Sequence, residues 1–192
     1  HYQQTKSYMD AFDEQGFLVM DEARWFESTK EAMEQLESLI KRDRNRPSVI
    51  MWSTSNEELR HITENGKKLH KAIAAQIRKY DYTRPVTAAE DKTPDKSAIY
   101  DECDFIGINY NLSIYDTVHK MRPDKPIFAS ECCATGTTRD WNFDTAVFGR
   151  IRDKDRDTND WFLGREKTYK FLRERAYVFG CYQWAAVEHR GE

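Results

Sequence analysis

Several features are scarce in this sequence of 192 residues, and each scarcity excludes a class of protein. With 8 glycines and 5 prolines, the chain is not fibrous, low-complexity or disordered. Its four cysteines have no CxxC spacing, so they predict buried thiols rather than a disulfide framework or a zinc site. No run approaches the ~20 apolar residues of a membrane span. The first residues, HYQQTKSYMD, have neither the basic nor the apolar region of a leader, and the sequence leaves the compartment open. The chain is therefore expected to fold as a globular domain.

An excess of charge of either sign is also lacking. Thirty Lys and Arg stand against 33 Asp and Glu, which gives a formal net charge of −3. Binding to nucleic acid or to an anionic membrane needs a concentrated basic surface, and this balance does not predict one. The expected partner is a small or neutral molecule.

Short apolar runs and amphipathic runs alternate along the whole chain. Most of the apolar runs lack a strict period of two, as expected for strands buried on both faces of a parallel sheet. The six predicted strands are Phe17 to Met20, Val49 to Trp52, Pro85 to Ala88, Phe105 to Tyr110, Pro126 to Ala129 and Val178 to Trp184.

The runs between these strands have helical periodicity. One predicted helix begins at Ser28, which forms a capping-box pattern with Glu31, and ends before Pro47. Three others are predicted, one ahead of Gly16 with Tyr8, Met9 and Phe12 on one face, one over Thr63 to Tyr80, and one over Asp160 to Tyr177 that buries Phe162, Tyr169, Leu172 and Ala176.

Alternating strands and helices predict βα units around a parallel sheet, in either a barrel or a doubly wound fold. A doubly wound nucleotide-binding fold would show a glycine-rich turn after an early strand, and neither GxGxxG nor GxxxxGK[ST] occurs. The barrel is therefore favoured. However, 192 residues and six strands fall short of the ~250 residues of a complete (β/α)8 barrel.

Acidic and amide side chains follow several of the predicted strands. The carboxyl ends of the strands are where a barrel places its active site, although any one of these residues could also be a helix cap or a solvated loop end. They are Glu22, Asn56, Glu57, Glu90 and Glu131.

Several segments together resemble glycoside hydrolase family 2, the retaining β-galactosidases, β-glucuronidases and β-mannosidases. They span nearly the whole chain: HY at the start, GFLVMDEA at 16–23, RNRPSVIMWSTSNE at 44–57, DFIGINY at 104–110, KPIFASE at 125–131 and GCYQWAAVEHRGE at 180–192. The resemblance implies strands three to eight of the barrel, with residues 1–192 as part of the catalytic domain. Two barrel strands and the family's β-sandwich domains would then precede His1.

The resemblance implies two catalytic carboxyl groups. Glu57 would be the general acid and base, and Glu131 the nucleophile that forms a glycosyl-enzyme intermediate. Such chemistry needs one protonated and one ionised carboxyl group about 5 to 5.5 Å apart.

Five further residues are implied to bind the sugar. Asn56 would bond to the 2-hydroxyl group, Tyr110 would hold the nucleophile, and Trp184 would form the aromatic floor of the site. His1 would line the pocket, and Glu22 either lines it or accepts buried hydrogen bonds. The structural alternatives are a helix cap for Asn56 and core packing for Tyr110 and Trp184.

The sequence departs from the family in two respects. The magnesium ligands of some bacterial relatives have no counterpart in Arg24 to Ser28, so we expect no metal and no cofactor. The charged stretch Asp140 to Asp160 is either a loop beside the site or a solvated excursion. Six strands on their own would leave an open edge, which predicts little activity for the isolated chain and a possible homodimer through that edge.

The choice of sugar rests on the WAAVEHRGE ending, which resembles the β-galactosidase branch. β-Glucuronidase and β-mannosidase are the alternatives within the family. A barrel that binds carbohydrate without catalysis is an alternative of another class, as is a hydrolase that uses Cys132 or Cys133 with His119. Two carboxylates at matching depths argue against the binding barrel, because like charges brought close together disfavour joint ionisation. The cysteine hydrolase needs a histidine near the same strand ends, and His119 lies within a predicted helix.

Overall fold

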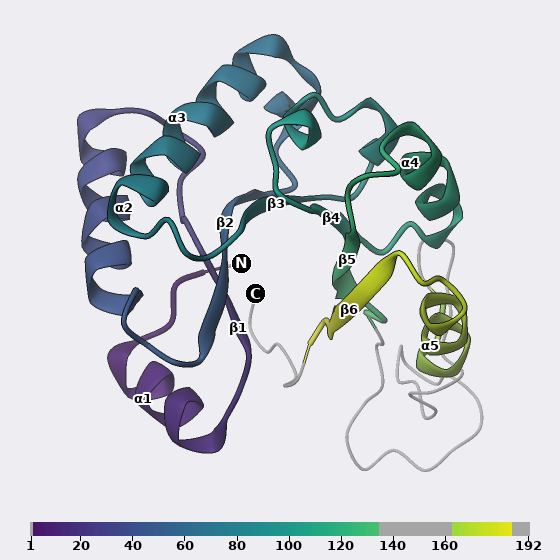
Figure 1. Cartoon of the computed structure of the whole chain (residues 1–192), viewed down its shortest axis with the longest axis horizontal. Coiled ribbons are helices and arrows are strands. Elements are labelled where there is room, and N and C mark those ends of the chain that lie inside the picture. The colour runs from purple at the N-terminus through teal and green to yellow at the C-terminus, as the bar shows by residue number, and fades with distance from the viewer. Residues whose placement is uncertain (1, 135–162, 186–192) are drawn as a thin grey trace, which may run out of the picture. The chain divides into compact units, whose positions relative to one another are not determined.

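The computed structural model describes residues 2–134 and 163–185, and the chain forms two compact units. The N-terminal unit is His1–Ile106 and the C-terminal unit is Gly107–Glu192. In each unit, strands alternate with helices along the chain (Figure 1).

The N-terminal unit holds three parallel strands that pair in chain order. In the register, Glu22 lies opposite Ser53, and Asn56 lies opposite Ala89. The carboxyl ends of these strands therefore meet at one edge of the sheet. The helices and strands of this unit are α1 (Lys6–Gln15), β1 (Val19–Glu22), α2 (Lys30–Asp43), β2 (Val49–Asn56), α3 (Glu64–Tyr80) and β3 (Val86–Glu90). Short 3₁₀ helices cover η1 (Leu59–Ile62), η2 (Pro94–Lys96) and η3 (Ile99–Asp101).

The helix ends of this unit follow local sequence signals. Gly16, with φ 71°, ends α1 in the left-handed conformation that glycine adopts readily. The Thr63 hydroxyl caps α3 by accepting from the Gly66 N–H at 3.0 Å. The capping box predicted at Ser28 is wrong, because the cap of α2 is Thr29, whose hydroxyl accepts from the Ala32 N–H at 3.3 Å.

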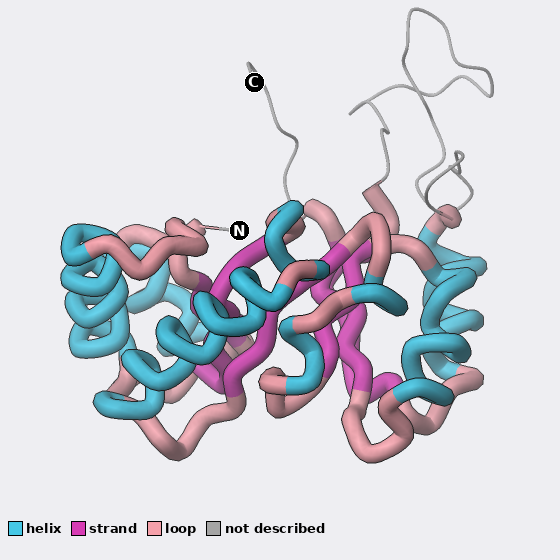
Figure 2. Tube along the Cα trace, turned by 90° about the horizontal axis from the view of Figure 1, so that it is seen from above, coloured by secondary structure: helices cyan, strands magenta, loops and turns pink. Residues whose placement is uncertain are grey.

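One apolar cluster fills the space between the strands and the helices α2 and α3, which pack against each other on one face of the sheet (Figures 1 and 2). Trp52 lies in it with its indole N–H donating to Asp81 at 2.9 Å, so the one polar atom of that ring is satisfied. The buried members are Met9, Ala23, Phe26, Leu36, Leu39, Ile40, Val49, Trp52, Ile73, Ala74, Ile77 and Val86.

The C-terminal unit holds a second set of strands and helices. Strand β5 pairs in parallel with β6, with Ala129 opposite Cys181 and Cys132 opposite Gln183. The elements are β4 (Ile106–Asn109), which begins at the last residue of the other unit, η4 (Leu112–Ile114), α4 (Tyr115–Met121), β5 (Ile127–Cys132), α5 (Arg165–Arg173) and β6 (Val178–Gln183).

Helices α4 and α5 are joined by packed rings and an ion pair. The rings of Tyr115 and Phe171 meet edge to face at 5.7 Å, and Arg175, just after α5, binds both carboxylate oxygens of Asp116 at 2.8 and 2.9 Å. Two predictions about α5 are wrong, because Tyr169 is 50% exposed and Ala176 is also exposed. Leu172 is buried as predicted, whereas Phe162 and the charged stretch Asp140 to Asp160 lie outside the described residues.

All six predicted strands exist, but their ends are shifted. The first begins at Val19, since Phe17 and Leu18 are 56% and 63% exposed and only connect α1 to the sheet. At the other end, β1, β2, β3 and β5 run two to four residues further than predicted. The polar residues expected to follow these strands are therefore within them, at Glu22, Asn56, Glu90 and Glu131.

Candidate active site

Asn56 and Glu57 lie at the carboxyl end of β2. Asn56 is its last residue, and Glu57 turns the chain out of the sheet with φ 56°, a left-handed conformation that is unusual for a glutamate. The Glu57 N–H donates to the Ala89 carbonyl oxygen of β3 at 2.9 Å. Both side chains are half-buried. The backbone of the proposed acid is thus tied to the neighbouring strand.

Glu22 lies at the same edge of the sheet, at the end of β1. Its side chain is 2% exposed, and its Oε2 accepts a hydrogen bond from the Ser53 hydroxyl at 2.7 Å. The structure thus shows the buried acceptor that the sequence left as one of two options. Contact with a sugar stays a prediction.

A chain of buried polar side chains at this edge was not foreseen from the sequence. The Ser55 hydroxyl lies 2.8 Å from His61 Nε2, and His61 Nδ1 lies 3.2 Å from Glu90 Oε2. Sequence reasoning noted Glu90 at a strand end but passed over His61. The one signal in the sequence was the position of this histidine, four residues after the proposed acid Glu57.

The pKa of Glu90 shows that these buried hydrogen bonds stabilise its negative charge. Burial alone would raise the pKa, but the His61 side chain and the N–H groups of Lys92 and Asp91 lower it below its ordinary value. Glu90 is therefore ionised at neutral pH, and its negative charge is compensated by hydrogen bonds inside the protein.

The C-terminal unit brings Tyr110 and Glu131 together. The Tyr110 hydroxyl donates to Glu131 Oε2 at 2.6 Å, and the Tyr110 N–H donates to the Glu131 carbonyl oxygen at 2.7 Å. Tyr110 follows β4 with φ 51°, and beside it the Ser130 hydroxyl donates to Asn109 Oδ1 at 2.7 Å. One strand end thereby fixes both the backbone and one carboxylate oxygen of the proposed nucleophile.

Trp184 directly follows β6 in the same unit. Its N–H donates to the Cys132 carbonyl oxygen at 2.8 Å, and its side chain is half-buried. Cys132 and Cys133 follow Glu131 and are buried, and all four cysteines are free thiols. His1 lies outside the described residues.

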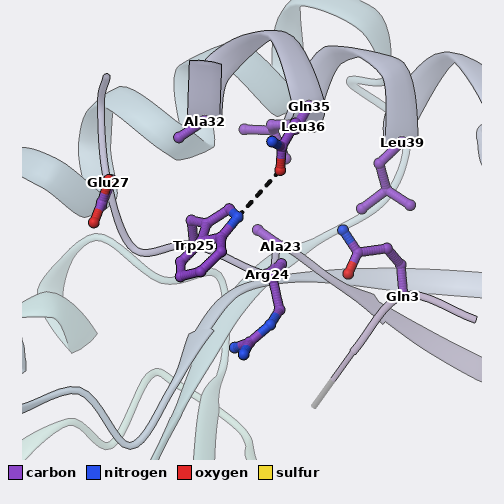
Figure 3. Close-up of a pocket in the computed structure, with 9 residues that line it drawn as sticks. All are labelled: Gln3, Ala23, Arg24, Trp25, Glu27, Ala32, Gln35, Leu36 and Leu39. Carbon is purple, nitrogen blue, oxygen red and sulfur yellow. Dashed lines mark hydrogen bonds between the residues drawn. The ribbon is translucent and has the colours of Figure 1, made fainter. Parts of the chain in front are cut away.

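The segment after β1 packs against helix α2. Trp25 donates its indole N–H to Gln35 Oε1 at 3.1 Å, and Glu27 is exposed (Figure 3). The hollow in this region is lined by Gln3, Ala23, Arg24, Trp25, Glu27, Ala32, Gln35, Leu36 and Leu39. Among residues 2–134 and 163–185, no group of three or more His, Cys, Asp or Glu side chains could hold a metal ion. No helix in the described part of the chain is both long and apolar enough to traverse a bilayer.

Comparison with known proteins identifies the family. Residues 25–138, more than half of the chain, match the sequence model of "Glycosyl hydrolases family 2, TIM barrel domain". The chain belongs to this family, and its alternating strands and helices are those of an incomplete (β/α)8 barrel.

Relatives with curated names act on two different sugars. The chain is 25% identical to the β-galactosidase BoGH2A of Bacteroides ovatus, over 100% of this chain and 30% of that protein. It is 32% identical to human β-glucuronidase, over 60% of this chain and 19% of that protein. The chain thus spans less than a third of the length of either relative.

Solved structures agree on the fold. A family 2 glycosyl hydrolase from Bacteroides cellulosilyticus superimposes with a TM-score of 0.75 at 27% identity, over 97% of this chain and 23% of that one. The β-glucuronidase of Ruminococcus gnavus in complex with D-glucuronic acid gives a TM-score of 0.77 at 24% identity, over 96% of this chain and 35% of that one. At that identity the second likeness concerns the fold alone.

Proposed function

We propose that this chain forms part of the catalytic barrel of a retaining exo-acting β-glycosidase that releases terminal β-linked galactose. The observation that carries the proposal is the pairing of Tyr110 with Glu131, in a family 2 barrel domain that also places Asn56 and Glu57 at a strand end. These side chains supply the donor and acceptor groups that a double displacement needs.

Glu131 acts as the nucleophile in this proposal. Its Oε2 accepts from the Tyr110 hydroxyl, and the carboxylate held in this way attacks the anomeric carbon. The tyrosine hydrogen bond fixes the carboxylate and favours its ionised form, which is the reactive one. As the bond to the sugar forms, the leaving oxygen departs from the opposite face of the anomeric carbon.

Glu57 acts as the general acid in the same step. It protonates the departing oxygen, and as a carboxylate it then removes a proton from the water that releases the sugar from Glu131. Asn56 would bond to the 2-hydroxyl group, a contact that tightens in the transition state. Glu22, Trp184 and His1 are proposed to line the sugar site.

Two observations bear on the sugar. The relative that aligns with the whole chain is named a β-galactosidase, which supports galactose. Human β-glucuronidase has the higher identity over its shorter span, which makes glucuronic acid the second candidate.

We also propose that the chain is a section of a longer enzyme with β-sandwich domains and two barrel strands ahead of His1. The fraction of each relative that it spans supports this proposal.

Hydrolysis of nitrophenyl β-galactoside and nitrophenyl β-glucuronide by the longer enzyme tests the function. We expect activity on the galactoside, and a loss of about 10²- to 10⁴-fold in kcat for Glu57→Gln, the usual contribution of a general acid and base. Glu131→Gln should abolish turnover, whereas Glu58→Gln, a change at the neighbouring carboxylate, should retain it. Activity on the glucuronide alone would show that the sugar is glucuronic acid and not galactose. Full activity of Glu57→Gln or Glu131→Gln would contradict the mechanism.

A further inference from the structure

Three buried side chains form a hydrogen-bonded series around the segment that carries Glu57. Ser55, His61 and Glu90 are 3%, 0% and 4% exposed. They come from three different elements, the end of β2, the 3₁₀ helix η1 and the end of β3. The Oγ to Nε2 distance is 2.8 Å, and the Nδ1 to Oε2 distance is 3.2 Å. Such a series is costly to bury unless each polar atom is satisfied.

The ionised Glu90 decides how the imidazole of His61 is oriented. A carboxylate only accepts hydrogen bonds, so His61 must present its Nδ1–H to Glu90. Nε2 then faces the Ser55 hydroxyl, which donates to it when the ring is neutral. The ring of Phe26 meets the imidazole edge to face at 5.0 Å and blocks rotation on that side. His61 is thereby held in one orientation.

Glu57 lies between the two points where this series grips the chain. Ser55 precedes it by two residues and His61 follows it by four. Further hydrogen bonds fix the backbone of the segment: the Glu57 N–H donates to Ala89, the His61 N–H donates to Glu58, and the Ala98 N–H donates to His61, each at 2.9 Å. The left-handed conformation of Glu57 is strained, and such strain persists only where the surroundings enforce it.

We propose that His61 is a positioning residue for Glu57. Its imidazole connects Ser55 to Glu90 and so fixes the turn that presents the Glu57 carboxyl group to the leaving oxygen. The inference rests on the proposed function of Glu57. His61 itself is fully buried and acts only through the turn. Removal of its hydrogen bonds releases η1 from the two strand ends, and the Glu57 carboxyl group then loses its alignment with the leaving oxygen.

The structure offers a matched control in His70. This residue is also 0% exposed, and its Nδ1 lies 2.8 Å from the hydroxyl of Thr54, the neighbour of Ser55 on β2. His70 lies on α3, on the helix side of the sheet, and its other nitrogen lies 3.6 Å from Cys103 Sγ. In the described part of the chain, His70 is linked to the series by a 3.4 Å contact between Thr54 and Ser55 and by an electrostatic effect of His61, and it has no hydrogen bond to Glu90 or to η1. Its substitution therefore reports the loss of a buried histidine without release of η1.

The leaving group separates a positioning defect from a loss of stability. A poor leaving group such as methanol needs the proton of Glu57, whereas dinitrophenolate leaves without it. The test compares kcat/KM, which reports the glycosylation step, for methyl and 2,4-dinitrophenyl glycosides of the sugar that the wild-type longer enzyme hydrolyses. His61→Phe, which fills the space without the hydrogen bonds, should lower kcat/KM for the methyl glycoside by about 10- to 100-fold, as a misplaced catalytic group does. The dinitrophenyl value should change by less than about threefold, the allowance we make for indirect effects.

Three further variants complete the test. Ser55→Ala deletes one oxygen and should show the same selective loss at a smaller size, even if His61→Phe does not fold. His61→Gln, which keeps an amide for one of the two partners, should restore part of the methyl glycoside activity. His70→Gln should change kcat/KM for both glycosides by the same factor.

Two results are decisive against the inference, and they are distinguishable. If His61→Phe and Ser55→Ala lower kcat/KM for both glycosides by the same factor, as His70→Gln does, then His61 contributes only packing. The positioning role is then wrong, while the proposed function stands. If the wild-type longer enzyme hydrolyses neither of the two nitrophenyl glycosides used to find its sugar, the proposed function itself fails and the role of His61 fails with it.

Discussion

At the scale of the residue, the best defined feature of the site is the short bond between Tyr110 and Glu131. A hydroxyl that donates to a carboxylate forms a charge-assisted hydrogen bond, which is about twice as strong as a neutral one. The same two residues are also joined through the backbone, at 2.7 Å. Tyr110 can therefore stabilise the ionised form of Glu131, the proposed nucleophile, without moving.

Removal of this hydroxyl should weaken the nucleophile selectively. We expect Tyr110→Phe to lower kcat/KM about 10- to 100-fold, because a hydrogen bond to a charged group contributes about 1.5 to 3 kcal/mol. Steady-state kinetics of the longer enzyme measures this loss. Tyr115→Phe is the control, since that buried hydroxyl bonds only to the Ile108 carbonyl oxygen at 3.3 Å in the described part of the chain. An equal loss in both variants would contradict the role given to Tyr110.

A second residue, Asp21, makes a prediction about pH. Burial, and next the charge and hydrogen bonding of the nearby Asp43, raise the pKa of Asp21 from 3.8 to about 7, against a smaller opposing effect of Arg42. Because the folded state holds this proton more tightly than the unfolded state, stability falls as pH rises from about 4 to about 7.

Asp21→Asn should therefore stabilise the fold at pH 8 relative to wild type, and much less at pH 4.5. The expected gain is of the order of 1 to 3 kcal/mol, since one pKa unit corresponds to about 1.4 kcal/mol and relaxation reduces the full value. Urea unfolding at the two pH values measures it. Glu14→Gln, at an exposed position, serves as the control. An identical effect of Asp21→Asn at both pH values would contradict the raised pKa of Asp21 in the folded state.

At the scale of the element, the sequence predicted the kind and order of the six described strands and located the longer helices among them. The hydrophobic periodicity is strong enough to identify α3 at nearly its true bounds, Glu64–Tyr80. It fails at element ends, because strand pairing continues past the apolar residues. Asn56 and Glu131 belong to their strands for this reason: the hydrogen bonds of a ladder depend on the backbone and not on side-chain polarity.

The start of α2 is another end that local sequence left ambiguous. Ser28 and Thr29 are both residue types that cap helices well, and in the structure the cap is Thr29. We expect Thr29→Ala to reduce the free energy of unfolding by about 1 kcal/mol, because the Ala32 N–H loses its acceptor. Ser28→Ala should cost less than half of that. Thermal unfolding of the two variants decides between them, and the reverse order would restore the predicted capping box.

At the scale of the whole molecule, the family and the fold class could be predicted, since several strand-end motifs together are specific. Candidate catalytic residues could be proposed from that resemblance and remain a prediction, whereas the hydrogen bonds around them could not be foreseen. His61 approaches Ser55 and Glu90 only after β2 and β3 pair, so a contact over 29 residues has no signature in a local pattern. The sugar also stays undecided by sequence, because relatives of similar identity act on different ones.

The open edge of the sheet leads to a prediction for the isolated chain of 192 residues. Among the described strands, β1 pairs with β2 alone, so its other side has no strand neighbour. Such an edge favours pairing with a second copy. We propose that the isolated chain dimerises and has little activity, and light scattering with a galactosidase assay tests this. A monomeric, fully active species would contradict it.

The central claim is that Glu131 forms a covalent bond to the sugar. An activated 2-fluoro-galactoside traps such an intermediate, because the fluorine slows its hydrolysis more than its formation. Mass spectrometry of the longer enzyme should show the addition of one fluorosugar, on the peptide that contains Glu131, with no addition to Glu131→Gln. A label on another carboxylate, or its absence in an enzyme that hydrolyses nitrophenyl β-galactoside, would contradict the account.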